Sequence, residues 1–209
     1  MDDAPPVTAR AIRFAAPRLL RWWDSTVLRT GLLLAGLAVA VGLRVVLAGP
    51  TLARAVASAM LFAVALLTLA VMSGWRPSRP SRATIAAGIA GGLVLLVLPV
   101  LTHAGGPYLR LGQAAPLPLW VAVTVLVATA EEALLRGALF AASPSRTLLV
   151  PAVLSTVAFA LLHVPLYGWH VVPLDLAVGL WLSGLRIVTG GATAPAVAHV
   201  VADLGTWGA

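Results

Sequence analysis

LPLWVAVTVLVATAEEALLRGALFAA, residues 117–142, is a long apolar run that carries two adjacent acids, Glu131 and Glu132. The run is long enough to cross a membrane as a helix, which takes about 20 residues. A charge at the centre of a bilayer costs about 2.5–3.5 kcal/mol on insertion scales. Two such charges side by side are hard to explain as packing, and an ionisable residue inside a span is by default a candidate for function.

The composition places the whole chain in the same class as this segment. Of 209 residues, 60% are hydrophobic and only 10% are charged, whereas soluble domains carry about 25% charged residues. We therefore predict an all-α fold, a polytopic transmembrane helix bundle of about seven spans separated by Gly- and Pro-rich turns. The expected spans are 31–49, 54–73, 83–101, 117–142, 147–164, 171–188 and 191–207.

The chain divides into three predicted parts. Residues 1–30 form a basic segment, in which residues 9–23 read as an interfacial helix with Trp22 and Trp23 as anchors. A disordered basic tail is the alternative for that stretch. Residues 31–116 hold the N-terminal transmembrane helices, and residues 117–209 hold the core with the chemically interesting side chains.

The positive charge indicates a membrane partner. All fourteen basic residues are Arg and the net charge is +7. Because these residues mostly flank apolar spans, we expect them to meet lipid headgroups and not nucleic acid. Most lie on one side when the N-terminus is cytoplasmic, with Arg44, Arg54 and Arg110 on the outer side, as the positive-inside rule requires. The composition is typical of a bacterial chain, so we expect a multi-pass protein of the bacterial cell membrane, of unknown oligomeric state.

Glu131 and Glu132 point about 100° apart on a helix. Only Glu132 has a basic partner at i+4, Arg136, in the favourable order. We therefore predict a structural ion pair between Glu132 and Arg136, which leaves Glu131 free as a candidate general base. The alternative is that both glutamates only pair with Arg residues and hold helices together.

Two further spans carry polar groups at helical spacing. In the fifth, His163 follows Phe159 by four residues, and Pro165 is expected to kink or end the helix just after His163. In the seventh, Asp203 follows His199 by four residues and would fix its tautomer. An interfacial histidine and a local pair near the chain end, with no part in catalysis, are the alternatives. Buried polar groups must satisfy one another, so we expect these side chains to meet around a water-filled cavity.

Three motifs, each on its own span, resemble those of one known family. They are Glu-Glu-x-x-x-Arg at 131–136, Phe-x-x-x-His at 159–163 and His-x-x-x-Asp at 199–203. In order and spacing they are similar to the CPBP family of intramembrane proteases. This family includes the type II CAAX prenyl endopeptidases and bacterial bacteriocin-processing or immunity proteins. The resemblance covers about residues 117–207.

This resemblance implies an endopeptidase that acts without a covalent intermediate on a membrane-associated peptide or protein. By similarity, Glu131 and His163 activate a water molecule, while His199 and the residue at position 203 stabilise the oxyanion. The commoner pattern has Asn at the last position. An ionised Asp203 cannot donate a hydrogen bond, so it is either neutral or serves to orient His199, or this member is weak or inactive.

A zinc enzyme competes with the metal-free mechanism, because family members are often called metalloproteases. Its ligands would be Glu131, His163 and His199, which are residue types that bind zinc. No His-Glu-x-x-His stretch is present, and we favour hydrolysis without a cofactor. A non-catalytic scaffold or immunity protein of the same fold is the second function hypothesis. A small transporter ranks third, because the polar groups cluster in one half without a matching repeat.

Overall fold

The computed structural model describes residues 25–102, 115–143, 145 and 147–205. The predicted interfacial helix at 9–23 lies outside these residues. Helices occur at all seven predicted positions, and the described part of the chain contains no strand, which confirms the all-α fold. In chain order the helices are α1 (Thr26–Leu47), α2 (Leu52–Met72), α3 (Arg82–Thr102), α5 (Leu117–Glu132), α6 (Phe140–Ala142), α7 (Leu149–Tyr167), α8 (Val172–Thr189) and α9 (Thr193–Leu204).

Five helical segments among the described residues are long and apolar enough to cross a membrane. They are Thr26–Leu47, Leu52–Met72, Leu117–Ala142, Leu149–Tyr167 and Trp169–Thr189. The predicted seventh span, 191–207, needs correction: α9 has 12 residues. At 1.5 Å per residue this is about 18 Å, short of the hydrocarbon thickness of about 30 Å. The helix that carries His199 and Asp203 therefore does not cross the bilayer by itself.

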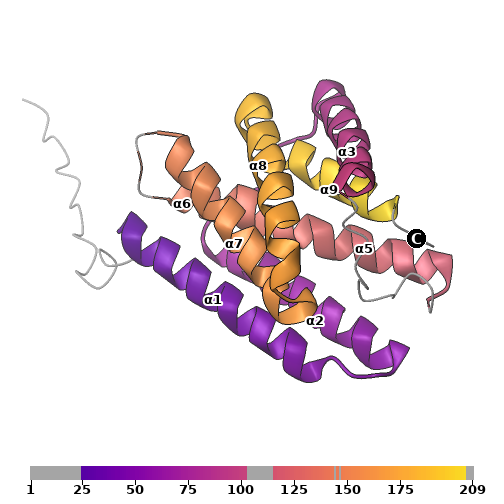
Figure 1. Ribbon diagram of the computed structural model, residues 1–209. Coiled ribbons are helices and arrows are strands. Elements are labelled where there is room, and N and C mark those ends of the chain that lie inside the picture. Colours follow the sequence, from indigo (N-terminus) through magenta and orange to yellow (C-terminus); the bar gives the residue numbers. More distant parts are fainter. Residues whose placement is uncertain (1–24, 103–114, 144, 146, 206–209) are drawn as a thin grey trace, which may run out of the picture.

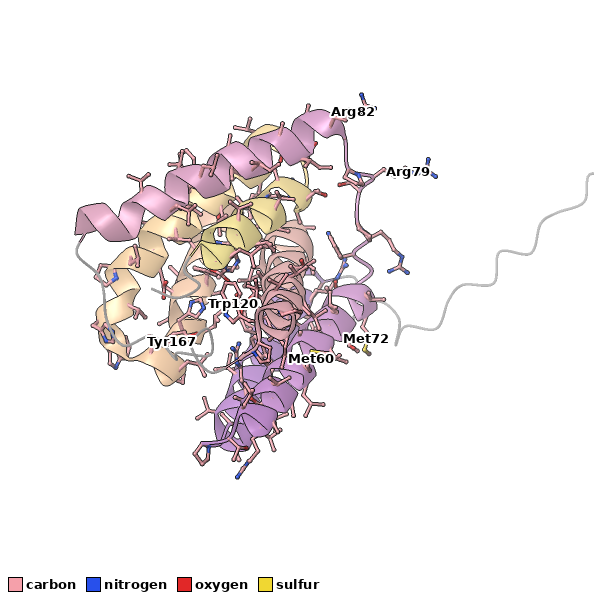
Figure 2. The ribbon with its side chains drawn as sticks, turned by 90° about the vertical axis from the view of Figure 1, so that its right-hand side faces the viewer. Met60, Met72, Arg79, Arg82, Trp120 and Tyr167 are labelled. Carbon is pink, nitrogen blue, oxygen red and sulfur yellow. The ribbon has the colours of Figure 1, made fainter. Side chains whose placement is uncertain are left out.

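The helices pack around the segment that runs from α5 to α6 (Figure 1). α1 and α2 form one pair and α7 and α8 another, while the short α9 lies between α3, α5 and α8. The main core joins α1, α2, α7 and the segment from α5 to α6, with Phe62, Leu66, Leu135 and Phe159 among its members. Large apolar side chains such as Val46 and Val188 are exposed on the outside, as expected for a lipid-facing surface. At the start of α3, Arg79 and Arg82 point away from the bundle (Figure 2).

Two glycines of α3 allow α9 to approach closely. A Cβ atom at Gly88 would lie 2.8 Å from the carbonyl oxygen of Ala194, and one at Gly92 would lie 2.7 Å from that of Ala198. Small residues four apart permit such backbone contacts between membrane helices. This contact fixes the position of α9 and of the polar side chains on it.

The long helix that begins with α5 changes geometry where its charges are. Residues Ala133–Leu139 form a π-helical segment that joins α5 to α6. Such segments occur mostly as single turns inside α-helices, often at functional sites. Gly137 lies in this segment, and a Cβ atom there would come within 2.5 Å of the Trp75 indole. The connection after α2 therefore packs directly onto the widened turn.

Pro165 does not end the helix just after His163. α7 continues past His163 and past Pro165, and ends at Tyr167. The residue that ends it is Gly168, at a φ of 93°, a conformation that favours glycine. His163 therefore lies one turn inside the helix and not at its last residue.

Candidate functional site

Glu131 and Glu132 lie at the end of α5 and are both buried. Arg136 Nη1 donates to Glu132 Oε1 over 2.8 Å, so the predicted ion pair is present, and both side chains are wholly inaccessible. Arg136 Nη2 also donates to the carbonyl oxygen of Gly179 over 3.1 Å. Its guanidinium stacks on the Phe159 ring at 4.7 Å. These contacts anchor Glu132 to α7 and α8.

The surroundings of Glu131 include a residue that the sequence did not point to. Arg44 Nη1 of α1 lies 3.8 Å from Glu131 Oε1. The side chain of Arg44 is only 12% exposed, although the charge pattern assigned it to the outer flank. In the sequence, the one indication that Arg44 is partly buried was its position three residues before the end of a long apolar helix. The opposite oxygen, Glu131 Oε2, lies 4.0 Å from His199 Nε2.

His199 connects the two glutamates to Asp203. Its Nδ1 donates to Glu132 Oε1 over 3.1 Å, because an ionised carboxylate only accepts. Its Nε2 lies 3.6 Å from Asp203 Oδ2. Glu132 is thus shared between Arg136 and His199, and is more than the structural partner of Arg136 that the spacing predicted. Three carboxylates around one imidazole favour its protonated, cationic form.

His163 is held by a different carboxylate. Its Nδ1 lies 3.3 Å from Asp175 Oδ2 at the start of α8. Both atoms are buried, and within the described part of the chain neither makes a hydrogen bond, so the contact is electrostatic. Asp175 was missed by the sequence analysis, although it is the single acid of the predicted span 171–188. No ion pair or hydrogen bond joins His163 to Glu131 among the described contacts.

The Phe159 ring lies between the two imidazoles. Its centroid is 4.8 Å from that of His163 and 5.4 Å from that of His199, both in edge-to-face geometry. The Tyr167 ring lies on the other side of His163, at 5.6 Å. The structure thus brings Glu131, Glu132, His199 and Asp203 into direct proximity, with His163 one aromatic ring away.

The zinc alternative stays a prediction. Within the part of the chain that the structure describes, no group of three His, Asp or Glu side chains is arranged to hold one ion. Of the three suggested ligands, Glu131 and His199 lie 4.0 Å apart, while His163 directs Nδ1 at Asp175.

An apolar groove of about 360 Å³ is lined by residues of α5 and α9 and by the connection after α2. Thr129 and Ala133 line it on α5, on either side of the two glutamates in sequence, and Ala196 and Val200 line it on α9 around His199. A second cavity of about 410 Å³, lined by Ser145 and Arg186 among others, lies at α6 and the turn that follows it. Neither lining includes the acids or histidines of the cluster.

Comparison with known proteins gives one family. Residues 113–205 match the family described as Type II CAAX prenyl endopeptidase Rce1-like. The matched segment contains all three motifs, from α5 to α9, and confirms the resemblance that the motifs indicated. Neither a curated protein nor a solved structure matches the chain.

Proposed function

We propose that this chain, whose residues 113–205 match the Rce1-like family of type II CAAX prenyl endopeptidases, is an intramembrane endopeptidase that cleaves a membrane-associated peptide or protein. The observation that carries the proposal is the meeting of acids and an imidazole from two separate motifs. Glu131 and Glu132 of one motif flank His199 of another, at 4.0 and 3.1 Å. Phe159 of the third motif lies in contact with His199.

The proposed nucleophile is a water molecule activated by Glu131. The gap of 4.0 Å between Glu131 Oε2 and His199 Nε2 is too wide for a direct hydrogen bond and is suited to one bridging water. Glu131 takes a proton from this water as the oxygen attacks the scissile carbonyl carbon. The same proton then passes to the leaving amine, so that the carboxylate is regenerated and water is the only reagent consumed.

His163 assists as a second base in this proposal. A proton on Nδ1, directed at Asp175, leaves the lone pair on Nε2. Asp175 is then a positioning residue, because it selects the tautomer of His163 without touching the substrate. The contact of both rings with Phe159 restricts their orientation.

The oxyanion is stabilised by His199. As the water leaves Nε2 and attacks, the protonated imidazole donates from Nε2 to the carbonyl oxygen of the scissile bond, where the negative charge develops. Asp203 Oδ2, at 3.6 Å from Nε2, supports the cationic form of His199 through its charge. An ionised Asp cannot donate to the oxyanion, so in this chain the donor role falls to the imidazole alone.

The substrate is expected to approach through the lipid-facing side of the bundle. The apolar groove beside α5 and α9 suits a nonpolar segment next to the scissile bond. The multi-pass bundle accounts for the membrane as a partner. We further propose that the N-terminus is cytoplasmic and that the host membrane is the bacterial cell membrane, as the Arg distribution and the composition indicate.

A second candidate is a scaffold or immunity protein of the same fold. The observation that favours it is Asp203, which supplies an acceptor where the commoner family pattern supplies an amide donor. Such a protein would bind a partner without cleaving it. Its effect in cells would then survive the loss of Glu131 and His163.

The decisive experiment uses the full chain in lipid vesicles with a panel of membrane-anchored peptides in heavy-oxygen water. Hydrolysis places heavy oxygen in each new terminal carboxylate, which mass spectrometry detects. We expect labelled products with the native chain and none with Glu131→Ala or His163→Ala. The matched control is His170→Ala, which removes an exposed histidine outside the cluster and should leave cleavage unchanged. Labelled products that persist in Glu131→Ala would refute the proposal.

A further inference from the structure

Arg44 reaches the charged cluster from a helix outside the family match. α1 (Thr26–Leu47) precedes residues 113–205, yet its Arg44 lies 3.8 Å from Glu131 Oε1. The guanidinium is also held over the Phe62 ring of α2 at 4.7 Å, and this ring is buried. A cation stacked on an aromatic ring is stabilised at that position, more so when water is excluded.

Charge balance explains why a cation is needed there. Adjacent ionised glutamates repel each other, and an isolated buried carboxylate takes up a proton instead of staying charged. Arg136 contacts Glu132 at 2.8 Å and so neutralises that residue. His199 donates to Glu132 as well. Among the described contacts, the ion-pair partners of Glu131 are Arg44 Nη1 at 3.8 Å and His199 Nε2 at 4.0 Å, and His199 is shared with Glu132 and Asp203.

The other groups near Glu131 do not replace this charge. Besides His199, its electrostatic neighbours are Arg136, Tyr167 and Asp203. Asp203 adds a further negative charge when ionised, and Arg136 is bonded to Glu132 and to the backbone of Gly179. Arg44 is the cation that contacts Glu131 and neither of the other acids in the cluster.

We propose that Arg44 is a positioning residue that keeps Glu131 ionised next to an ionised Glu132. It attracts Oε1, which leaves Oε2 directed towards His199. At 3.8 Å the guanidinium supplies charge without a full hydrogen bond, so the carboxylate stays available as a base. This inference rests on the proposed function only for the role of Glu131 as that base. It makes the α1–α2 pair part of the site.

The sequence offers a direct test of the charge state. Glu131 and Glu132 are the only glutamates in the chain, so glutamate labelled with carbon-13 at its side-chain carboxyl gives two signals. Their shifts distinguish ionised from protonated groups, and Glu131→Gln assigns them. In vesicles at neutral pH we expect two ionised signals for the native chain. Arg44→Met should convert the Glu131 signal to the protonated form, and Arg44→Lys should restore it.

The matched control is Arg54→Met, which removes an exposed Arg at the start of α2 and should leave both signals ionised. An Arg44→Met spectrum identical to that of the native chain would overturn the proposal. If Arg44→Met does not fold, the double variant Arg44→Met/Glu131→Gln decides. Restored folding supports a charge pair, whereas a double variant that is equally unfolded contradicts it.

Cleavage provides the second readout. Arg44→Met should lower kcat by about 100-fold, the scale of one general base, with little change in KM, and Arg44→Lys should recover part of the loss. If the native chain cleaves nothing while the carboxyl signals respond as expected, the peptidase assignment fails and the charge pairing stands. If cleavage occurs and the carboxyl signals do not respond to Arg44→Met, the peptidase assignment stands and the charge pairing fails.

Discussion

Replacing Arg136 by Met tests the electrostatic basis of the bundle. The side chains of Arg136 and Glu132 have no solvent exposure and meet at 2.8 Å. Met carries no charge, so Arg136→Met leaves the Glu132 carboxylate buried, with His199 as its one remaining polar partner among the described residues. The desolvation of Glu132 is then no longer offset by its main counter-charge.

The magnitude follows from the geometry. At 2.8 Å and an effective dielectric constant of about 20, the attraction is about 6 kcal/mol. Part of this is cancelled because the charge of Arg136 no longer has to be desolvated, and removal of one partner of a buried pair costs about 3–5 kcal/mol in known cases. The contact of Arg136 with Phe159 at 4.7 Å adds about 1–2 kcal/mol. We expect Arg136→Met to lower the free energy of unfolding by about 4 kcal/mol.

The double variant Glu132→Gln/Arg136→Met separates charge from packing. Gln keeps an acceptor for His199 and carries no charge, so the double variant should recover at least about 2 kcal/mol of the loss. Unfolding of the purified chain is followed by circular dichroism during titration of mixed micelles with a denaturing detergent. Arg54→Met, at an exposed position, should change the free energy of unfolding by less than about 0.5 kcal/mol. An Arg136→Met chain as stable as the native one, or a double variant no more stable than Arg136→Met, would refute this electrostatic account.

Three further predictions concern the contacts around the site. Gly92→Ala places a Cβ atom 2.7 Å from a backbone carbonyl oxygen of α9 and should lower the free energy of unfolding by about 1–3 kcal/mol. Gly42→Ala, whose Cβ atom meets open space, should leave the free energy of unfolding unchanged. The same detergent titration measures both variants. Asp203→Asn keeps an acceptor and adds an amide donor, so its kcat/KM should equal or exceed that of the native chain, and a tenfold loss would contradict the orienting role. Asp175→Leu removes the partner of His163 and should lower kcat at least about tenfold. Asp175→Asn should lower kcat by a smaller factor. Equal kcat values for the two variants would argue against selection of the His163 tautomer by Asp175.

The sequence predicted the helices well because the signal for a membrane helix is additive. Apolar runs of sufficient length, separated by Gly and Pro, identified α1, α2, α3, α5, α7 and α8 without knowledge of their packing. α9 was the exception. Its 12 residues continue into apolar positions that also suit a longer span, and only its close packing on Gly88 and Gly92 explains how so short a helix is held in the bundle.

The site was predicted where its partners are local in sequence. The pair Glu132–Arg136 follows from i, i+4 spacing, and so does the proximity of His199 and Asp203. Partners from distant helices were missed. Nothing in the sequence near position 44 or position 175 shows that α1 and α8 place their charges against Glu131 and His163.

By itself the sequence determined that this chain is a membrane bundle and that a small set of acids and imidazoles must account for its chemistry, because burial of charge in lipid is too costly to occur without a role. Tertiary structure alone decided which carboxylate meets which cation. A charge in a low-dielectric interior interacts with whatever lies within a few ångströms, and that distance is set by helix packing and not by separation along the chain.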